Sequence, residues 1–272
     1  MKEDCRIDAP DKSRNDKSKD DKSPDELTDF WNRRADTFPR YSDSPNSFGS
    51  DMLELAKSLG VTFQDSSVLD IGAGSGQYTL KIAQMAKKVV ALDLSDKMLA
   101  VSKVDAQALG LSNIEYVLSS WLDYPLPGPF DVVFASMCPA LRSDEAINKL
   151  LESVGRSLVH IGFYDYVDPA PMAALINHYG VSKKKFNSGP EMRRWFDDHS
   201  LPCRHVQKSG RWVVDYDRDE AVSWCRTILA DYGVDAPDED LILTCLGPTW
   251  AEMEQKYVFD TPYFVEMLVW HK

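Results

Sequence analysis

The chain has 272 residues, a hydrophobic share of 43% and a formal net charge of −12. This length suits one large α/β domain, or one domain with an insertion, and the apolar share is sufficient for a sizeable core. Because so acidic a surface repels a phosphate backbone, we expect no nucleic-acid partner.

Five cysteines are spread along the chain without a C-x-x-C pair. Their odd number and wide spacing favour reduced thiols over a disulfide framework. No apolar run reaches the length that spans a bilayer, and the N-terminus lacks the apolar segment of a signal peptide. We therefore expect a cytoplasmic protein without a membrane partner. The histidines are scattered, and Cys203-x-His205 is too weak a pattern to predict a metal site.

The first part of the chain divides into a tail and a helix. Residues 1–24 mix both charges with almost no apolar side chains, which predicts a disordered tail. Residues 25–272 are predicted to form a single domain. At its start, "DELTDFWNRRADTF" has the apolar spacing of a helix.

Strands then alternate with helices as far as residue 165. Strands are predicted at 67–72, 89–94, 113–118, 130–136 and 157–163. The helices between and before them are predicted at 51–60, 76–88, 96–110 and 143–156. This alternation predicts a parallel sheet with right-handed crossovers.

The pattern loosens after residue 165. Helices are predicted near 169–180 and 190–199, followed by a strand around 203–214. Two further helices are predicted at 219–232 and 238–258. The final "YFVEMLVWHK" has the composition of a strand.

A glycine loop follows the first predicted strand in "VLDIGAGSGQYTLKIA". A P-loop is excluded because Gln77 follows Gly76 without a Lys-Ser/Thr pair. A dinucleotide site requires G-x-G-x-x-G, but the third glycine falls on Gln77 or Thr79. The carboxylate of Asp70 would also repel a pyrophosphate. A tight strand-to-helix turn that needs glycines for its backbone alone stays open as an alternative.

The run Asp70-Ile71-Gly72-Ala73-Gly74-Ser75-Gly76 resembles the first motif of class I S-adenosylmethionine-dependent methyltransferases, an acid followed by G-x-G-x-G. S-adenosylmethionine carries an ammonium and a sulfonium and no phosphate, so an acid suits it. The resemblance covers about 30–165 well and continues more weakly to the C-terminus. It implies an α/β, Rossmann-like, seven-stranded, mostly parallel sheet. Helices cover both faces, and a helical insertion separates the last two strands.

The resemblance assigns the donor contacts to the strand ends. Asp70, Gly72, Ala73 and Gly74 would approach the methionyl and ribose parts of S-adenosylmethionine. Asp93, at the end of the second strand, would accept hydrogen bonds from the ribose hydroxyls, because Ser95 or Asp96 caps the next helix instead.

The adenine contacts are less typical of the family. Leu94 and Met98 would border the adenine, although ordinary helix packing explains them equally well. The family usually has Gly-Asp where this chain has Ser119-Ser120. Ser120 would then contact the adenine amino group, with Trp121 stacked on the purine. Ser136 would face the methyl donor from the fourth strand.

The predicted domain has three parts. Residues 25–48 are expected to form an N-terminal lid with Trp31, Phe38 and Tyr41 over the donor. Residues 49–165 form the cofactor-binding core, and 166–272 the C-terminal part. Within it, a helical cap at about 215–262 is rich in aromatic residues. We interpret this cap as an acceptor pocket, with a homodimer interface or a satellite core as the alternatives.

The predicted function is transfer of a methyl group from S-adenosylmethionine to a small-molecule acceptor. An in-line displacement at an activated carbon needs alignment more than a base, so we name no catalytic residue. An NAD(P)-dependent oxidoreductase, a non-catalytic S-adenosylmethionine-binding protein and a protein methyltransferase are the alternatives.

Overall fold

A computed structural model of the chain describes residues 23–181 and 188–272. The predicted tail lies outside these ranges except for its last two residues. Ser23 caps helix α1 (Pro24–Arg34) by accepting from the backbone N–H of Glu26. The helix therefore begins one residue before the predicted domain boundary.

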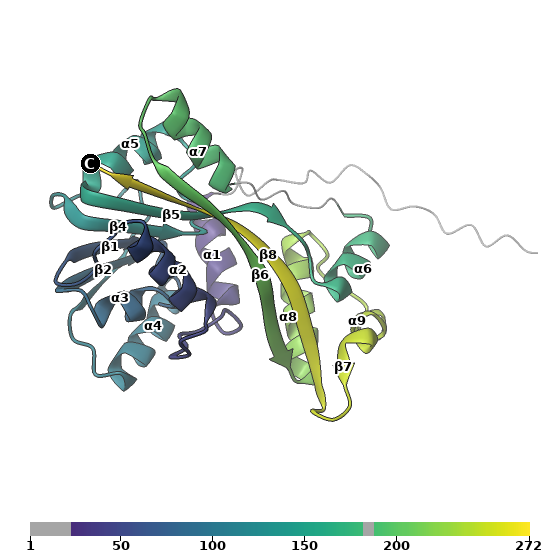
Figure 1. Cartoon of the computed structure of the whole chain (residues 1–272). Helices are drawn as coiled ribbons and strands as arrows, with labels where there is room; N and C mark the ends of the chain where they lie inside the picture. The colour runs from purple at the N-terminus through teal and green to yellow at the C-terminus, as the bar shows by residue number, and fades with distance from the viewer. Residues whose placement is uncertain (1–22, 182–187) are drawn as a thin grey trace, which may run out of the picture.

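The core is one twisted sheet of mostly parallel strands (Figure 1). Its first five strands are β1 (Ser67–Ile71), β2 (Lys88–Asp93), β3 (Ile114–Leu118), β4 (Phe130–Ser136) and β5 (Val154–Tyr166). Their order is β3-β2-β1-β4-β5, and every neighbouring pair among them is parallel. The order in which strands are added therefore reverses between β1 and β4. Open α/β sheets bind their ligands at this switch point.

Helices cover both faces of this sheet (Figure 1). One face packs against α2 (Phe48–Ser58) and α3 (Thr79–Ala83), with α4 (Asp96–Ala108) beside α3. The other face packs against α5 (Asp144–Ser153) and α7 (Ser188–Asp198). The predicted fold class is confirmed, although the sheet of the described residues has eight strands instead of seven, because the two-residue strand β7 (Trp250–Ala251) also pairs with β8 (Lys256–His271).

Helix α3 is shorter than the predicted helix 76–88. Gly76 has φ 88° and belongs to the loop, so the helix begins only at Thr79. The chain leaves the helix after Ala83 because it must turn back to begin β2 at Lys88.

The last strands differ from the prediction in length. β6 (Arg204–Tyr216) and β8 (Lys256–His271) pair along their whole length, and β8 lies antiparallel between β5 and β6. The predicted helix 238–258 is wrong beyond Leu246. There Gly247 and Pro248 lie in a short 3₁₀ turn (Gly247–Thr249), followed by β7 (Trp250–Ala251). The insertion between the long strands is therefore 217–255, and 256–262 belong to β8.

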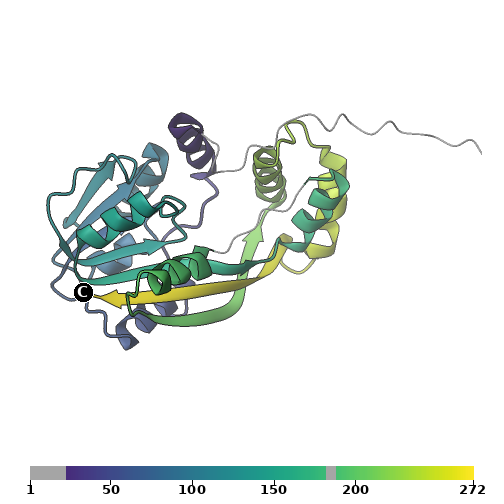
Figure 2. The same cartoon turned by 90° about the horizontal axis from the view of Figure 1, so that it is seen from above.

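The insertion folds into a cap lobe with its own core, seen from above in Figure 2. This lobe consists of α6 (Ala170–His178), α8 (Arg218–Asp231), α9 (Glu239–Leu246) and the distal ends of β6 and β8. The aromatic residues assigned to the cap pack mainly on one another: Tyr216, Trp224 and Phe259 form one group, and Trp250 and Tyr257 form a pair. Tyr216, Trp224, Tyr257 and Phe259 thus belong to a satellite core, which helix α6 from outside the insertion completes, whereas Trp250 is exposed.

Candidate functional site

The glycine loop after β1 is the centre of the site. Gly72, Gly74 and Gly76 all have positive φ, at 71°, 55° and 88°. A Cβ at Gly72 would lie 2.7 Å from the Cys138 sulfur, and one at Gly76 would lie 2.1 Å from the Ser102 hydroxyl oxygen. A Cβ at Gly74 would meet nothing closer than 3.8 Å. The outer glycines therefore allow tight packing, whereas a Cβ at Gly74 would make only ordinary van der Waals contact, with the Phe38 ring at 3.8 Å.

Asp93 joins this loop to the next helix. Its carboxylate accepts from the backbone N–H of Gly74 and of Ser95, each at 2.8 Å. Ser95 caps α4 through the N–H of Met98, as predicted. The expectation that this cap leaves Asp93 free is wrong, because the Asp93 carboxylate is bonded to backbone on both sides. Burial raises the pKa of Asp93, and these backbone hydrogen bonds oppose the shift.

Asp70 lies at the end of β1 and is only 3% exposed. Its carboxylate accepts from the Thr79 hydroxyl at 2.5 Å. Burial raises the pKa of Asp70 from 3.8 to about 7, and the nearby Asp93 adds to the shift. A cationic group bound beside Asp70 would relieve this electrostatic cost.

The predicted adenine contacts divide into two groups. Leu94 and Ser120 are partly exposed beside the strand ends, and the Ser120 hydroxyl donates to Asp123 at 2.6 Å. Met98, in contrast, is buried in the packing of α4. Trp121 is 3% exposed, and its indole N–H donates to the Ala146 carbonyl at 2.9 Å. Trp121 faces the core against α5, so we withdraw it as a stacking partner for a purine.

The lid segment reaches the loop through residues other than Tyr41. The Tyr41 hydroxyl accepts from Gln84 at 2.9 Å, which holds its ring over α3, so we withdraw Tyr41 as well. The Phe38 ring lies 3.8 Å from the position of a Cβ at Gly74, and the carbonyl of the neighbouring Pro39 accepts from the Ser75 hydroxyl at 2.5 Å. Trp31 packs edge-on against Phe38, with ring centroids 6.2 Å apart.

Ser136 ends β4 beside a buried tyrosine that the sequence did not single out. The Tyr78 hydroxyl is buried without a partner in hydrogen-bonding geometry, and Ser136 and Asp70 lie near it. Burial raises the Tyr78 pKa. The spacing of these residues in the sequence does not predict this contact. Tyr78 and Ser136 come close because β1 and β4 are neighbours in the sheet.

Cys138 is a packing residue. Its thiol is buried under Gly72, and burial raises its pKa to about 12, which argues against a thiolate nucleophile.

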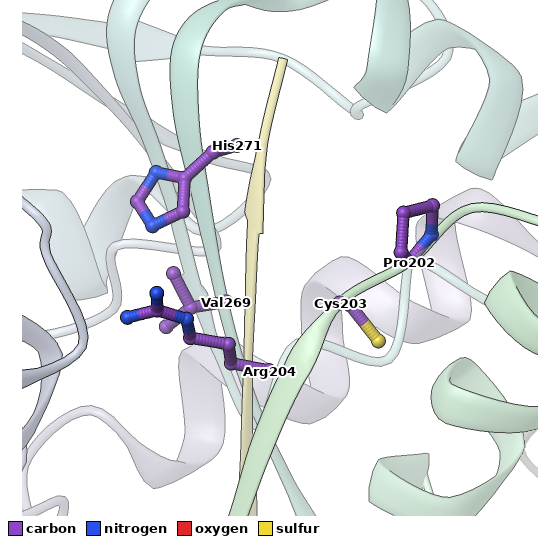
Figure 3. A pocket seen from close by; sticks show the side chains of 5 residues that line it. All are labelled: Pro202, Cys203, Arg204, Val269 and His271. Carbon is purple, nitrogen blue, oxygen red and sulfur yellow. The ribbon is translucent and has the colours of Figure 1, made fainter.

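A surface cavity lies at the other edge of the sheet (Figure 3). Its lining residues are Pro202, Cys203, Arg204, Val269 and His271. His271 pairs with Ser157 at the start of β5, whereas the glycine loop follows the end of β1. The cavity therefore takes no part in the candidate site.

Residues 23–181 and 188–272 contain neither a metal-binding cluster nor a membrane-spanning helix. No group of three or more histidine, cysteine or acidic residues is placed to hold a metal ion there. Among the helices of these ranges, none is long and apolar enough to cross a membrane.

Comparisons with known proteins agree with this geometry. A family model described as a methyltransferase domain matches residues 68–162, which run from β1 through most of β5. A protein-L-isoaspartate O-methyltransferase of Methanoregula boonei is 28% identical over 45% of this chain and 59% of its own length. An uncharacterized methyltransferase of Bacillus subtilis, YcgJ, is 25% identical over 66% of this chain and 70% of its own. Residues 68–162 of this chain therefore form a methyltransferase domain.

Solved structures extend the likeness in fold to most of the chain. The YcgJ structure has a TM-score of 0.51 at 18% identity, covering 81% of this chain and 98% of YcgJ. A structure of the [4+2]-cyclase SpnF has a TM-score of 0.55 at 14% identity, covering 92% and 97%. In sequence, the methyltransferase chain spans only 59% and 45% of the first two curated relatives that it matches.

Proposed function

We propose that this protein transfers a methyl group from S-adenosylmethionine to an acceptor. The observation that carries the proposal is the pair of carboxylates at the glycine loop, Asp93 bonded to the Gly74 N–H and the buried Asp70 at the end of β1. A cationic, phosphate-free ligand suits two acids, whereas a pyrophosphate would be repelled by both.

The chain's residues fit the parts of this donor. Asp93, partly exposed at the end of β2, would accept from the ribose hydroxyls. Asp70 would stabilise the ammonium, and the exposed backbone of Gly72 would approach the methionyl part. Leu94 and Ser120 would border the adenine. The donor supplies a methyl group on a sulfonium, and the protein's task is to align the acceptor and exclude water.

We propose a small molecule as the acceptor. Helix α1 lies between the core and the cap lobe (Figure 2), and the segment after it reaches the glycine loop through the Pro39–Ser75 hydrogen bond, so we expect these elements to restrict a bulky acceptor. The protein-L-isoaspartate O-methyltransferase of Methanoregula boonei matches over 45% of this chain, so its acceptor does not transfer with the core. A peptide acceptor is the second candidate.

Calorimetry with S-adenosylhomocysteine, NAD and NADP tests the donor. We expect binding of S-adenosylhomocysteine alone. Binding of a dinucleotide without it would overturn the proposal in favour of an oxidoreductase.

Turnover then separates an enzyme from a binding protein. A fold shared with a protein named a cyclase does not fix the reaction, so S-adenosylhomocysteine release should be followed over panels of metabolites and peptides. Release with one metabolite supports the small-molecule acceptor.

The compartment and the assembly are also proposals. The four described cysteines are unpaired, two of them buried, which suits a reducing compartment such as the cytoplasm. A homodimer stays a prediction, which light scattering on the purified protein checks.

A further inference from the structure

Helix α1 is bound to the core at the rim of the donor site. Asn32 accepts from the Ser95 hydroxyl at 2.5 Å and donates to the Asp96 carboxylate at 2.8 Å. Both partners lie within three residues of Asp93. The segment after the helix then passes over the glycine loop, where Pro39 accepts from Ser75. The helix and its following segment thus lie beside the groups that would hold the donor.

The same helix is bound to the cap lobe by an ion pair. The Arg34 guanidinium donates to the Asp231 carboxylate from Nε at 3.0 Å and from a terminal nitrogen at 2.5 Å. The side chain of Asp231 is 4% exposed and that of Arg34 is 21% exposed. The Arg34 guanidinium also lies 4.6 Å from the centroid of the Phe30 ring, itself buried. Figure 2 shows α1 between the core and α8. The Arg34–Asp231 pair joins α1 to α8.

We propose that the Arg34–Asp231 pair is a latch through which the cap lobe holds α1 over the donor site and thereby controls how fast the donor and its product leave. This inference rests on the proposed function. Arg34 and Asp231 are positioning residues, since they act through Asn32 and the segment around Phe38.

Charge burial gives the latch its strength. A charge-assisted pair with one partner almost fully buried is screened less by salt than a surface pair. Removing one partner leaves the other charge in a desolvated position, which favours movement of α1 away from α8. A movement of α8 would therefore also move α1, and with it the contacts of α1 beside the donor site.

The latch changes the role expected for the cap. The sequence-based interpretation assigns the cap to the acceptor pocket. Asp231 lies inside the insertion 217–255 and holds the lid helix, so replacement of 217–260 by a linker should also shorten the residence of S-adenosylhomocysteine. Such a replacement would in addition remove most of the cap-lobe core, so single substitutions are the sharper test.

The test compares Arg34→Met and Asp231→Asn with Arg226→Met. Arg226 lies on α8, the helix that carries Asp231, and pairs with Glu239 inside the cap lobe. It is therefore a matched control. Stopped-flow should show S-adenosylhomocysteine leaving about five to ten times faster from both latch variants than from wild type or the control. Without ligand, hydrogen exchange should rise in α1 of the latch variants while the amides of α2 stay protected.

Each readout has an outcome that overturns the proposal. Unchanged exchange in α1 of both latch variants would mean that the pair does not hold the helix. Faster exchange with unchanged dissociation would mean that the helix does not retain the ligand. If wild type binds no S-adenosylhomocysteine, the proposed function fails, and the donor role of the latch fails with it, whereas the exchange measurement still decides whether the pair holds α1. Arg34→Lys, which keeps the charge, should restore part of the protection.

Discussion

The carboxylate of Asp93 accepts a 2.8 Å hydrogen bond from the backbone N–H of Gly74, which ties the end of β2 to the glycine loop after β1. A second bond from Ser95 ties the same carboxylate to the start of α4. One side chain therefore fixes the positions of two elements that border the proposed ribose site. This arrangement makes Asp93 both a ligand candidate and a support for the loop.

Replacing Asp93 by Ala should weaken S-adenosylhomocysteine binding by about 1–3 kcal/mol, because a charged hydrogen-bond partner and the loop's anchor are lost together. Calorimetry on the folded variant gives the affinity. Glu115→Ala is the control, since Glu115 is an exposed acid of β3 paired only at the surface with Lys88. Wild-type affinity in folded Asp93→Ala would show that the ribose is not placed at this acid.

The glycines of the loop should respond differently to alanine. Gly76→Ala should lower the free energy of unfolding by about 2–4 kcal/mol, because its Cβ would clash with Ser102 at a positive φ. Gly74→Ala should cost only about 1–2 kcal/mol, the strain of φ 55° without a clash. Yet Gly74→Ala should lose more S-adenosylhomocysteine affinity, because its methyl group would lie on the part of the loop that is proposed to contact the donor.

Denaturant unfolding and calorimetry on the two glycine variants separate these effects. Equal binding by Gly74→Ala and wild type would indicate that the loop is a turn without a ligand.

Asp70 should make donor binding depend on pH. Its folded pKa of about 7 lies above the ordinary 3.8, so the folded protein binds the extra proton between these values. Stability from this group is therefore present at low pH and is lost as pH rises through about 7, at a cost of a few kcal/mol. Asp70→Asn should raise the melting temperature at pH 8 and leave it nearly unchanged at pH 4.

The same substitution should weaken binding. A bound ammonium favours the charged carboxylate, so wild-type affinity for S-adenosylhomocysteine should fall as pH drops below about 7. Asp70→Asn should bind weakly with a flatter profile between pH 6 and 8. A wild-type profile without any change over this range would contradict the ammonium contact.

Trp121 should behave as a core residue. Trp121→Phe loses the hydrogen bond to Ala146 and some buried area, so the free energy of unfolding should fall by about 1–3 kcal/mol. Affinity for S-adenosylhomocysteine should stay within about twofold of wild type. A large loss of affinity with full stability would return Trp121 to the adenine site.

The sequence by itself determined the sheet, the loop and the acids at the strand ends. The alternation of strand-like and helix-like apolar patterns predicted the first five strands, because each buried strand and each helix has its own local pattern. Asp70 and Asp93 could be predicted for a similar reason, since the carboxyl ends of neighbouring parallel strands meet at one edge. Their backbone partners could not be predicted.

Only the tertiary structure decided which face each remaining side chain takes. Trp121 and Met98 point into packing, Tyr41 lies on α3, and Phe38 lies nearest to Gly74 instead. Arg34 and Asp231 are 197 residues apart, and no local pattern links them. The direction of a side chain after a strand end depends on one or two backbone angles. Long-range pairs depend on how whole lobes pack. Neither leaves a periodic signal in the sequence.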